Sequence, residues 1–170
     1  MRFLSDASHS LLLAGVTSFF ALALAMLLNF GIRQPNQRLL KGAFRLVGLG
    51  YAFPGPVIAL GVLMPLSWFD QQLNQLFFDA GNSPNYWLSG TIFILIYAYL
   101  IRFLALAFGS VESGMANITP AIGDLGRMLG SPQWKIMRDL YLLMLKGSLW
   151  TGTLLVFVDV MKELPATLML

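Results

Sequence analysis

Long apolar stretches constrain what this chain can fold into more than any other feature of its sequence. Four follow one another along the 170 residues: Leu11–Phe30, about Leu46–Phe69, about Trp87–Gly109, and a stretch that begins near Leu142 and is still apolar at Leu170. Each approaches the roughly 20 residues that a helix needs to cross about 30 Å of hydrocarbon. We therefore predict an all-α fold, a polytopic membrane helical bundle of about four transmembrane helices.

The composition supports a membrane protein and excludes several kinds of site. The chain is 57% hydrophobic and 11% charged, whereas a soluble domain has about 25% charged residues. It has no cysteine, which excludes disulfides and thiolate metal sites, and we expect neither a metal site nor a cofactor. The first apolar stretch is longer than the core of a signal peptide, so we interpret it as a spanning helix.

Charges in the polar segments predict the orientation of the chain. Four basic residues and no acid follow the first stretch: Arg33, Arg38, Lys41 and Arg45. Only acids follow the second, Asp70 and Asp79. Four bases lie after the third: Arg127, Lys135, Arg138 and Lys146. Because basic loops stay in the cytoplasm, the first and third loops are predicted inside and the N-terminus outside. The topology of the chain in the membrane accounts for the clustering of these basic residues. We therefore do not expect nucleic acid as a partner.

The third loop, residues 110–146, has signals for two helices and a sharp turn. Thr119-Pro120 is typical of a helix start, and Gly130 is typical of the residue just after a helix. Ser131-Pro132 predicts a second start, and Lys135 and Asp139 are spaced for an i,i+4 ion pair. The segment Asp124–Gly130 is thus predicted to form a short amphipathic helix, either a docking element or a helix lying among lipid headgroups.

Charged residues also occur late in the last apolar stretch, at Asp159, Lys162 and Glu163. Charges at membrane depth cost roughly 2.5–3.5 kcal/mol each on insertion scales. We expect Asp159 to pair with Lys162 and Glu163 to stay uncompensated, and Pro165 to weaken the helix. A broken helix with charges is typical of a translocation pathway or gate; the alternative is an internal salt bridge that fixes packing. Arg102 is expected to extend to the headgroups.

At this point the residues resemble a known family, the permease subunits of binding-protein-dependent ABC importers. Their cytoplasmic loop has Glu-Ala-Ala, three residues, Gly, nine residues and Ile-x-Leu-Pro. This chain has Asp124, Leu125 and Gly126 at the first three positions and Gly130 at the glycine; the last three are Leu140, Leu142 and Leu143. Because Leu125 is bulkier than alanine, the groove of the partner protein that receives this loop should differ in shape from the groove typical of the family. The absence of proline at Leu143 predicts a straighter path into the last helix.

Three more segments resemble the ferric-iron branch of that family. They are Tyr51-Ala52-Phe53-Pro54-Gly55-Pro56, the run Phe157–Thr167, and Tyr99–Phe103. The resemblance covers roughly Val47 to Leu170 and is similar to the second half of a longer two-repeat permease. We accordingly expect residues 1–170 to form a single transmembrane permease domain, a fragment of a longer chain.

The resemblance implies a function and a set of partners. The loop would be a coupling helix, Asp124–Gly130, that docks in a groove of a separate ATPase through Leu125, Met128 and Leu129. The chain has no phosphate-binding G-x-x-x-x-G-K-[ST] motif, so we expect no enzyme activity here and ATP hydrolysis on the partner. Further partners would be a periplasmic solute-binding protein, a second permease half or protomer, and lipid of the bacterial inner membrane.

The substrate stays open at this point. The ferric-iron-type segments favour Fe(III), but permeases for thiamine, polyamines, sulfate or molybdate share the general fold. A non-transporting membrane scaffold is a further alternative. Because a binding protein captures the substrate in such importers, no metal ligands are expected on this chain.

Overall fold

The computed structural model describes residues 2–32, 47–77 and 91–163, and every regular element in these ranges is helical. The elements are α1 (Arg2–Ile32), α3 (Gly55–Phe77), α4 (Ile92–Ala116), α5 (Pro120–Met128), α6 (Gln133–Ile136), the π-helix η1 (Met137–Tyr141), α7 (Leu142–Met144) and α8 (Lys146–Lys162). Residues 47–52 form one further helical segment. The predicted all-α fold is confirmed.

Two described helices are long and apolar enough to cross a membrane. They are Ser8–Ile32 within α1, and α4. A third span results if Gln133–Met144 and α8 are counted as one bent element, with a bend of 76° between them. The described residues therefore have two or three spans, fewer than the four apolar stretches of the sequence.

The second apolar stretch is divided because the chain leaves helical geometry at Phe53-Pro54. Proline lacks a backbone N–H and disfavours helical geometry in the residue before it. A new helix starts directly afterwards, since the amides of Val57 and Ile58 donate to the Pro54 carbonyl at 3.0 and 3.3 Å. Pro65, in contrast, is accommodated inside α3.

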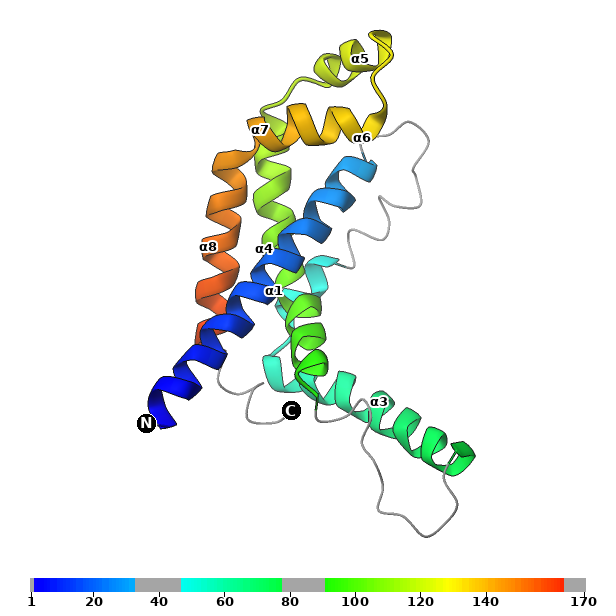
Figure 1. The fold of residues 1–170 in the computed structure, drawn as a ribbon, viewed down its shortest axis with the longest axis vertical. Helices are drawn as coiled ribbons and strands as arrows, with labels where there is room; N and C mark the ends of the chain where they lie inside the picture. The colour runs from blue at the N-terminus through cyan, green and yellow to red at the C-terminus, as the bar shows by residue number, and fades with distance from the viewer. Residues whose placement is uncertain (1, 33–46, 78–90, 164–170) are drawn as a thin grey trace.

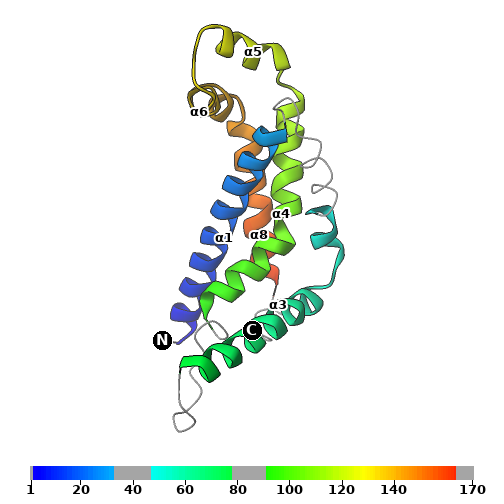
Figure 2. The ribbon, with the colours of Figure 1, turned by 90° about the vertical axis from the view of Figure 1, so that its right-hand side faces the viewer.

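Three helices, α1, α4 and α8, form the packed bundle (Figures 1 and 2), and they contact one another in every pair. Their shared core includes the most buried side chains of the described residues, among them Tyr99, Phe103, Val111 and Val156. Asn29 of α1 is buried as well, and its Nδ2 donates to Ala25 O at 2.9 Å and to Phe108 O of α4 at 3.3 Å. An interhelical hydrogen bond of this kind avoids an unsatisfied polar group in apolar surroundings.

Small residues allow α4 and α8 to approach closely. Ser110 and Gly114 of α4 face Ser148 and Gly152 of α8: a Cβ on Gly114 would overlap Ser148, and a Cβ on Gly152 would lie 3.0 Å from the Ser110 Cβ. Each helix thus contributes a serine and a glycine four residues apart. This spacing is the small-xxx-small pattern of membrane helix pairs, which associate by close packing because lipid supplies no hydrophobic driving force.

Replacing Gly114 with leucine is expected to force α4 and α8 apart. Overpacking of this kind costs about 1–3 kcal/mol or more, so the thermal midpoint of the protein in detergent should fall clearly. The matched control is Gly109→Leu on the same helix, where no atom lies within 4 Å of an added Cβ. Equal midpoints for the two variants would contradict the close crossing.

Candidate functional site

The predicted helix in the third loop is present as α5, with Thr119 as N-cap and Pro120 in its first turn. Its end is closed by two hydrogen bonds: Gly130 N donates to Arg127 O at 3.0 Å, and Ser131 N donates to Gly126 O at 3.1 Å. Gly130 has φ +73°. These features form a Schellman motif, so the predicted helix stop at Gly130 is confirmed. The next helix begins at Gln133 with Pro132 as N-cap, one residue later than Ser131-Pro132 predicts.

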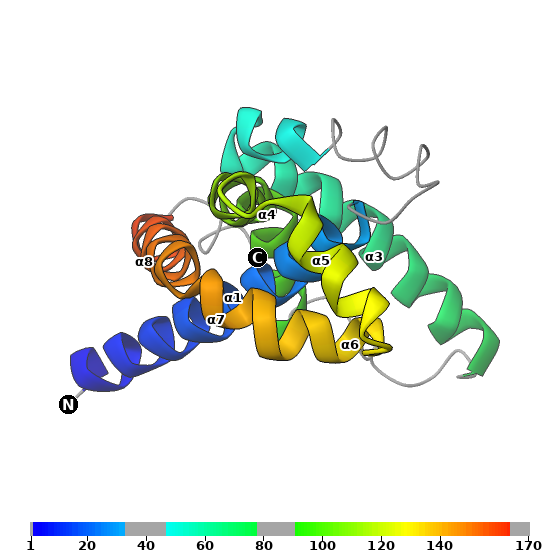
Figure 3. The same cartoon turned by 90° about the horizontal axis from the view of Figure 1, so that it is seen from above.

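The outward face of α5 and its C-terminal turn present large apolar side chains. Leu125 is 59% exposed, Met128 85% and Leu129 84%. Large exposed apolar groups that lie together indicate an interaction surface. We call Leu125, Met128 and Leu129 the apolar tip of the loop; α5 and α6 lie across one end of the bundle (Figure 3).

Asp124 and Arg127 form an ion pair with each other on this helix, with Arg127 Nη2 at 2.5 Å from Asp124 Oδ1. Both side chains are exposed, and exposed ion pairs of this kind contribute little to stability. The two charges thus neutralise each other in this conformation.

The inward face of α5 is made by glycines, a feature that the sequence reasoning missed. A Cβ on Gly123 would lie 2.9 Å from the Tyr141 hydroxyl oxygen, and a Cβ on Gly126 would lie 2.9 Å from side-chain carbons of Ile136. The helix therefore rests on Ile136 and Tyr141 with its backbone. Glycines three residues apart on a helix share a face, which is the signal that could have identified this contact.

The chain after α5 differs from two predictions. Lys135 and Asp139, both within the described ranges, form no ion pair with each other, because the π-helix η1 begins at Met137 and its wider turns change the i,i+4 alignment. The path into the last helix is also not straighter: the axis bends by 76° at Leu145, whose φ −90° and ψ 3° leave helical geometry. Leu145 is buried in the core, which holds the bend in place.

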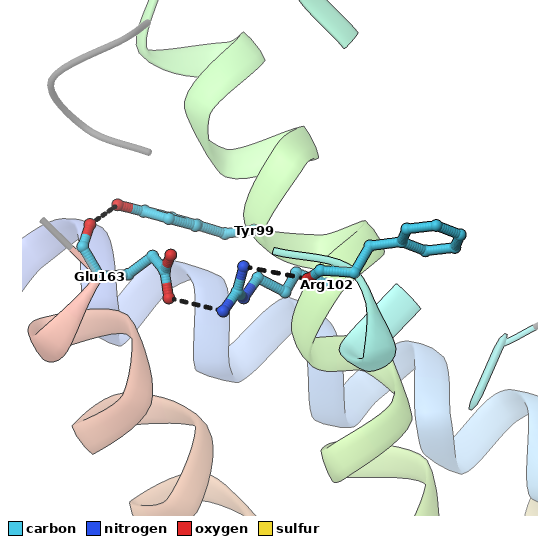
Figure 4. A network of polar contacts seen from close by, with 4 residues as sticks. Tyr99, Arg102 and Glu163 are labelled. Atoms are coloured by element: carbon cyan, nitrogen blue, oxygen red, sulfur yellow. Dashed lines mark hydrogen bonds and ion pairs between the residues drawn. The ribbon is translucent and has the colours of Figure 1, made fainter. Parts of the chain in front are cut away.

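A second constellation lies in the other half of the bundle, where Arg102 of α4 meets Glu163 just after α8 (Figure 4). Arg102 Nη2 is 3.2 Å from Glu163 Oε2, and the two side chains are only 18% and 12% exposed. Arg102 Nη1 also donates to the Phe53 carbonyl at 3.3 Å. The Tyr99 hydroxyl donates to the Glu163 carbonyl at 3.1 Å. Four residues from three segments are thus connected by polar contacts.

The interruption of the helix at Pro54 is part of this constellation. A Cβ on Gly55 would overlap the Glu163 carboxylate and lie 2.7 Å from Arg102 Nη1. Only glycine leaves room for the ion pair against this backbone. The segments Tyr51–Pro56 and Phe157–Glu163, which carry much of the family resemblance, meet here.

This geometry corrects three predictions about charges. Arg102 does not extend to the headgroups: it lies about 15 Å from the start of α4, near the middle of the helix. Glu163 has a partner, because its carboxylate pairs with Arg102. Within the described part of α8, Asp159 and Lys162 form no ion pair with each other. The reason is that α8 ends at Lys162, and Glu163, with ψ 62°, turns its carboxylate toward α4. Asp159 is half-buried and Lys162 exposed; Pro165 lies outside the described residues.

Metal binding finds no support in the described part of the chain. No three histidine, cysteine, aspartate or glutamate side chains there are grouped so that they could hold a metal ion. Glu163 is already engaged with Arg102.

The fold and the two constellations define a helical membrane bundle with an apolar tip at one end. No protein-family model matches the chain. The Fe(3+)-transport system permease protein FbpB 2 of Haemophilus influenzae is 28% identical over 169 residues, 99% of this chain and 30% of that protein. The putative 2-aminoethylphosphonate transport system permease protein PhnV of Salmonella typhimurium is 27% identical over 172 residues, 98% of this chain and 59% of that protein.

Both relatives are named as permease proteins of transport systems, so the predicted resemblance to importer permeases is confirmed, and it extends over nearly the whole chain. The chain spans less than two thirds of the length of either relative. The apolar helices and the permease relatives together indicate a multi-pass protein of the bacterial inner membrane.

Proposed function

We propose that this chain is part of the transmembrane subunit of an ABC importer and couples the substrate pathway to a separate ATPase. The observation that carries the proposal is the apolar tip: Leu125, Met128 and Leu129 are exposed on a helix whose end is fixed by the Schellman motif. A docking element has to transmit force, and a rigid turn with an apolar contact face meets that need. ATP hydrolysis then belongs to the partner.

The proposal places residues 110–146 in the cytoplasm and the Arg102–Glu163 end of the bundle in the outer half of the membrane. The basic residues of the loop support this orientation, since basic loops stay in the cytoplasm. A periplasmic solute-binding protein would deliver the substrate on the opposite side. A second permease half or protomer would complete the pathway.

We assign the pathway or gate to Asp159, Lys162 and Glu163 at the end of α8, and to Pro165 later in the sequence. Support comes from the Arg102–Glu163 pair, which holds charge at membrane depth next to the break at Pro54. Intramembrane charges that face the bundle interior are typical of transport pathways.

Fe(III) is the proposed substrate, supported by the ferric-iron-type segments and by the similarity to FbpB 2. The similarity to PhnV makes an aminoalkylphosphonate the second candidate. Uptake assays with ferric iron and with 2-aminoethylphosphonate, in cells that produce the full transporter, would decide between the two.

Changing Leu129 to glutamate is the test of docking. A carboxylate at this 84% exposed position would have to lose its water in an apolar groove, and an unpaired buried charge costs several kcal/mol. We expect the variant to insert normally in the membrane and to lose the ATPase during affinity purification.

The matched control is Gln133→Glu, which adds the same charge at an exposed position of the same loop outside the apolar tip. This variant should retain the ATPase. Equal retention by both variants would refute docking through Leu129.

A further inference from the structure

The docking helix α5 makes one of its two inward contacts with Tyr141, and Tyr141 in turn contacts another helix. Tyr141 is 4% exposed. On one side its hydroxyl lies against the Gly123 backbone of α5. On the other side its ring meets Phe30 of α1, with 5.5 Å between ring centroids and 76° between ring planes. Edge-to-face aromatic pairs of this geometry are favourable.

We propose that Tyr141 is the positioning residue through which α5 moves the end of α1. The inference rests on the proposed docking of α5 to an ATPase, and it adds the route by which a displacement would enter the bundle. Because glycine has no side chain to rearrange, a shift of α5 at Gly123 acts directly on the tyrosine. The tyrosine is enclosed in the core cluster, and the ring that meets it there from α1 is that of Phe30.

The π-helix explains why Tyr141 occupies this place. Five residues, Met137–Tyr141, form the π-turn, and a single extra residue in a helix rotates the downstream residues by about 100°. Tyr141 is the last residue of the turn, and its carbonyl still accepts from Leu145 N at 2.9 Å. The aromatic ring is thereby directed at α1 while the chain proceeds to the bend at Leu145.

Movement of α1 would reach the rest of the bundle. Phe30 lies in the last turn of α1, next to Asn29, whose Nδ2 donates to Phe108 O of α4. α1 also packs against α8. Packed elements of this kind transmit displacement through discrete rearrangements of contacts, and mutations between two sites test such coupling directly.

The absence of cysteine makes a labelling experiment straightforward. Two nitroxide labels would be placed through Leu27→Cys on α1 and Glu112→Cys on α4, both exposed positions. The distance between them would be measured by pulsed electron paramagnetic resonance in the full complex with the ATPase, without nucleotide and with ATP and vanadate. We expect ATP to shift the distance in the parent protein and Tyr141→Ala to remove most of that shift, with the ATPase still bound.

Further variants distinguish a relay, the transfer of movement from α5 through Tyr141 to α1, from a general loss of structure. Tyr141→Phe keeps the ring against Phe30 but removes the hydroxyl that lies against the Gly123 backbone, so it should pack normally and lose much of the shift. Phe30→Leu removes the other ring with a smaller change of volume and should lose the distance shift. This variant keeps the test decisive if Tyr141→Ala fails to fold. Tyr97→Ala, at an exposed position of α4, should behave as the parent.

The outcomes distinguish the relay from the docking on which it rests. A full shift in Tyr141→Ala, Tyr141→Phe or Phe30→Leu would overturn the route from Gly123 through Tyr141 to Phe30 while docking stands. Failure of the parent protein to retain any ATPase would overturn the docking itself, and the relay with it.

Discussion

Replacing Arg102 with leucine is expected to destabilise the bundle by about 3–5 kcal/mol, the cost of leaving one partner of a buried ion pair without the other. Glu163 would keep a carboxylate that is only 12% exposed, and the Phe53 carbonyl would lose its donor. The measurement is the free energy of unfolding in mixed detergent micelles, together with the amount of protein found in the membrane fraction.

The double variant Arg102→Leu/Glu163→Leu should recover much of this loss, because neither charge of the pair remains in the bundle. Recovery should be incomplete, since Arg102 also bonds Phe53 O and lies over the Phe103 ring at 5.6 Å. Lys162→Leu is the control: it removes an exposed charge beside Glu163 and should change stability little. A single variant as stable as the parent, or a double variant no better than the single, would refute the structural role of the pair.

Gly130→Pro is expected to abolish transport while leaving membrane insertion intact. The glycine has φ +73°, which proline cannot adopt because its ring fixes φ near −65°. Proline also removes the N–H that donates to Arg127 O. The last turn of α5 would open and displace Met128 and Leu129, so the ATPase should no longer dock. Uptake of ferric iron and recovery of the ATPase on purification would measure the two effects.

Asparagine at the same position provides the control, because it tolerates the left-handed conformation better than other residues with a side chain. Gly130→Asn should keep most of the transport activity. If Gly130→Pro transported at the parental rate with the ATPase bound, the fixed turn would have no role in coupling.

Features determined by neighbours in the chain can be predicted from the sequence. Thr119-Pro120 and Gly130 mark the two ends of α5 through local backbone preferences, and the structure has both ends there. The apolar stretches predict the helical fold for a similar reason, since their length alone matches a membrane. The break at Pro54 divides the second stretch, however, because proline ends a helix whose apolar composition continues past it.

Features that depend on contacts between helices are predicted poorly. Helical spacing suggests a pair between Asp159 and Lys162, yet the partner that matters is Arg102, which the fold brings to Glu163 from another helix. The bend at Leu145 could not be predicted, because the local sequence, without a proline at Leu143, predicts a straight entry into α8. The burial of Leu145 in the core fixes the path of the chain instead. The small residues of α4 and α8 carry a usable signal in their four-residue spacing.

The Arg102–Glu163 pair also limits the electrical work that its two charges contribute when the bundle moves in a membrane potential. A single charge that crosses the full potential gains or loses about 2.3 kcal/mol for every 100 mV. Opposite charges 3.2 Å apart that move together experience nearly equal and opposite work. The pair can therefore travel with its helices through the field at almost no electrical cost, whereas a bundle that retained only one of the two charges would become sensitive to voltage.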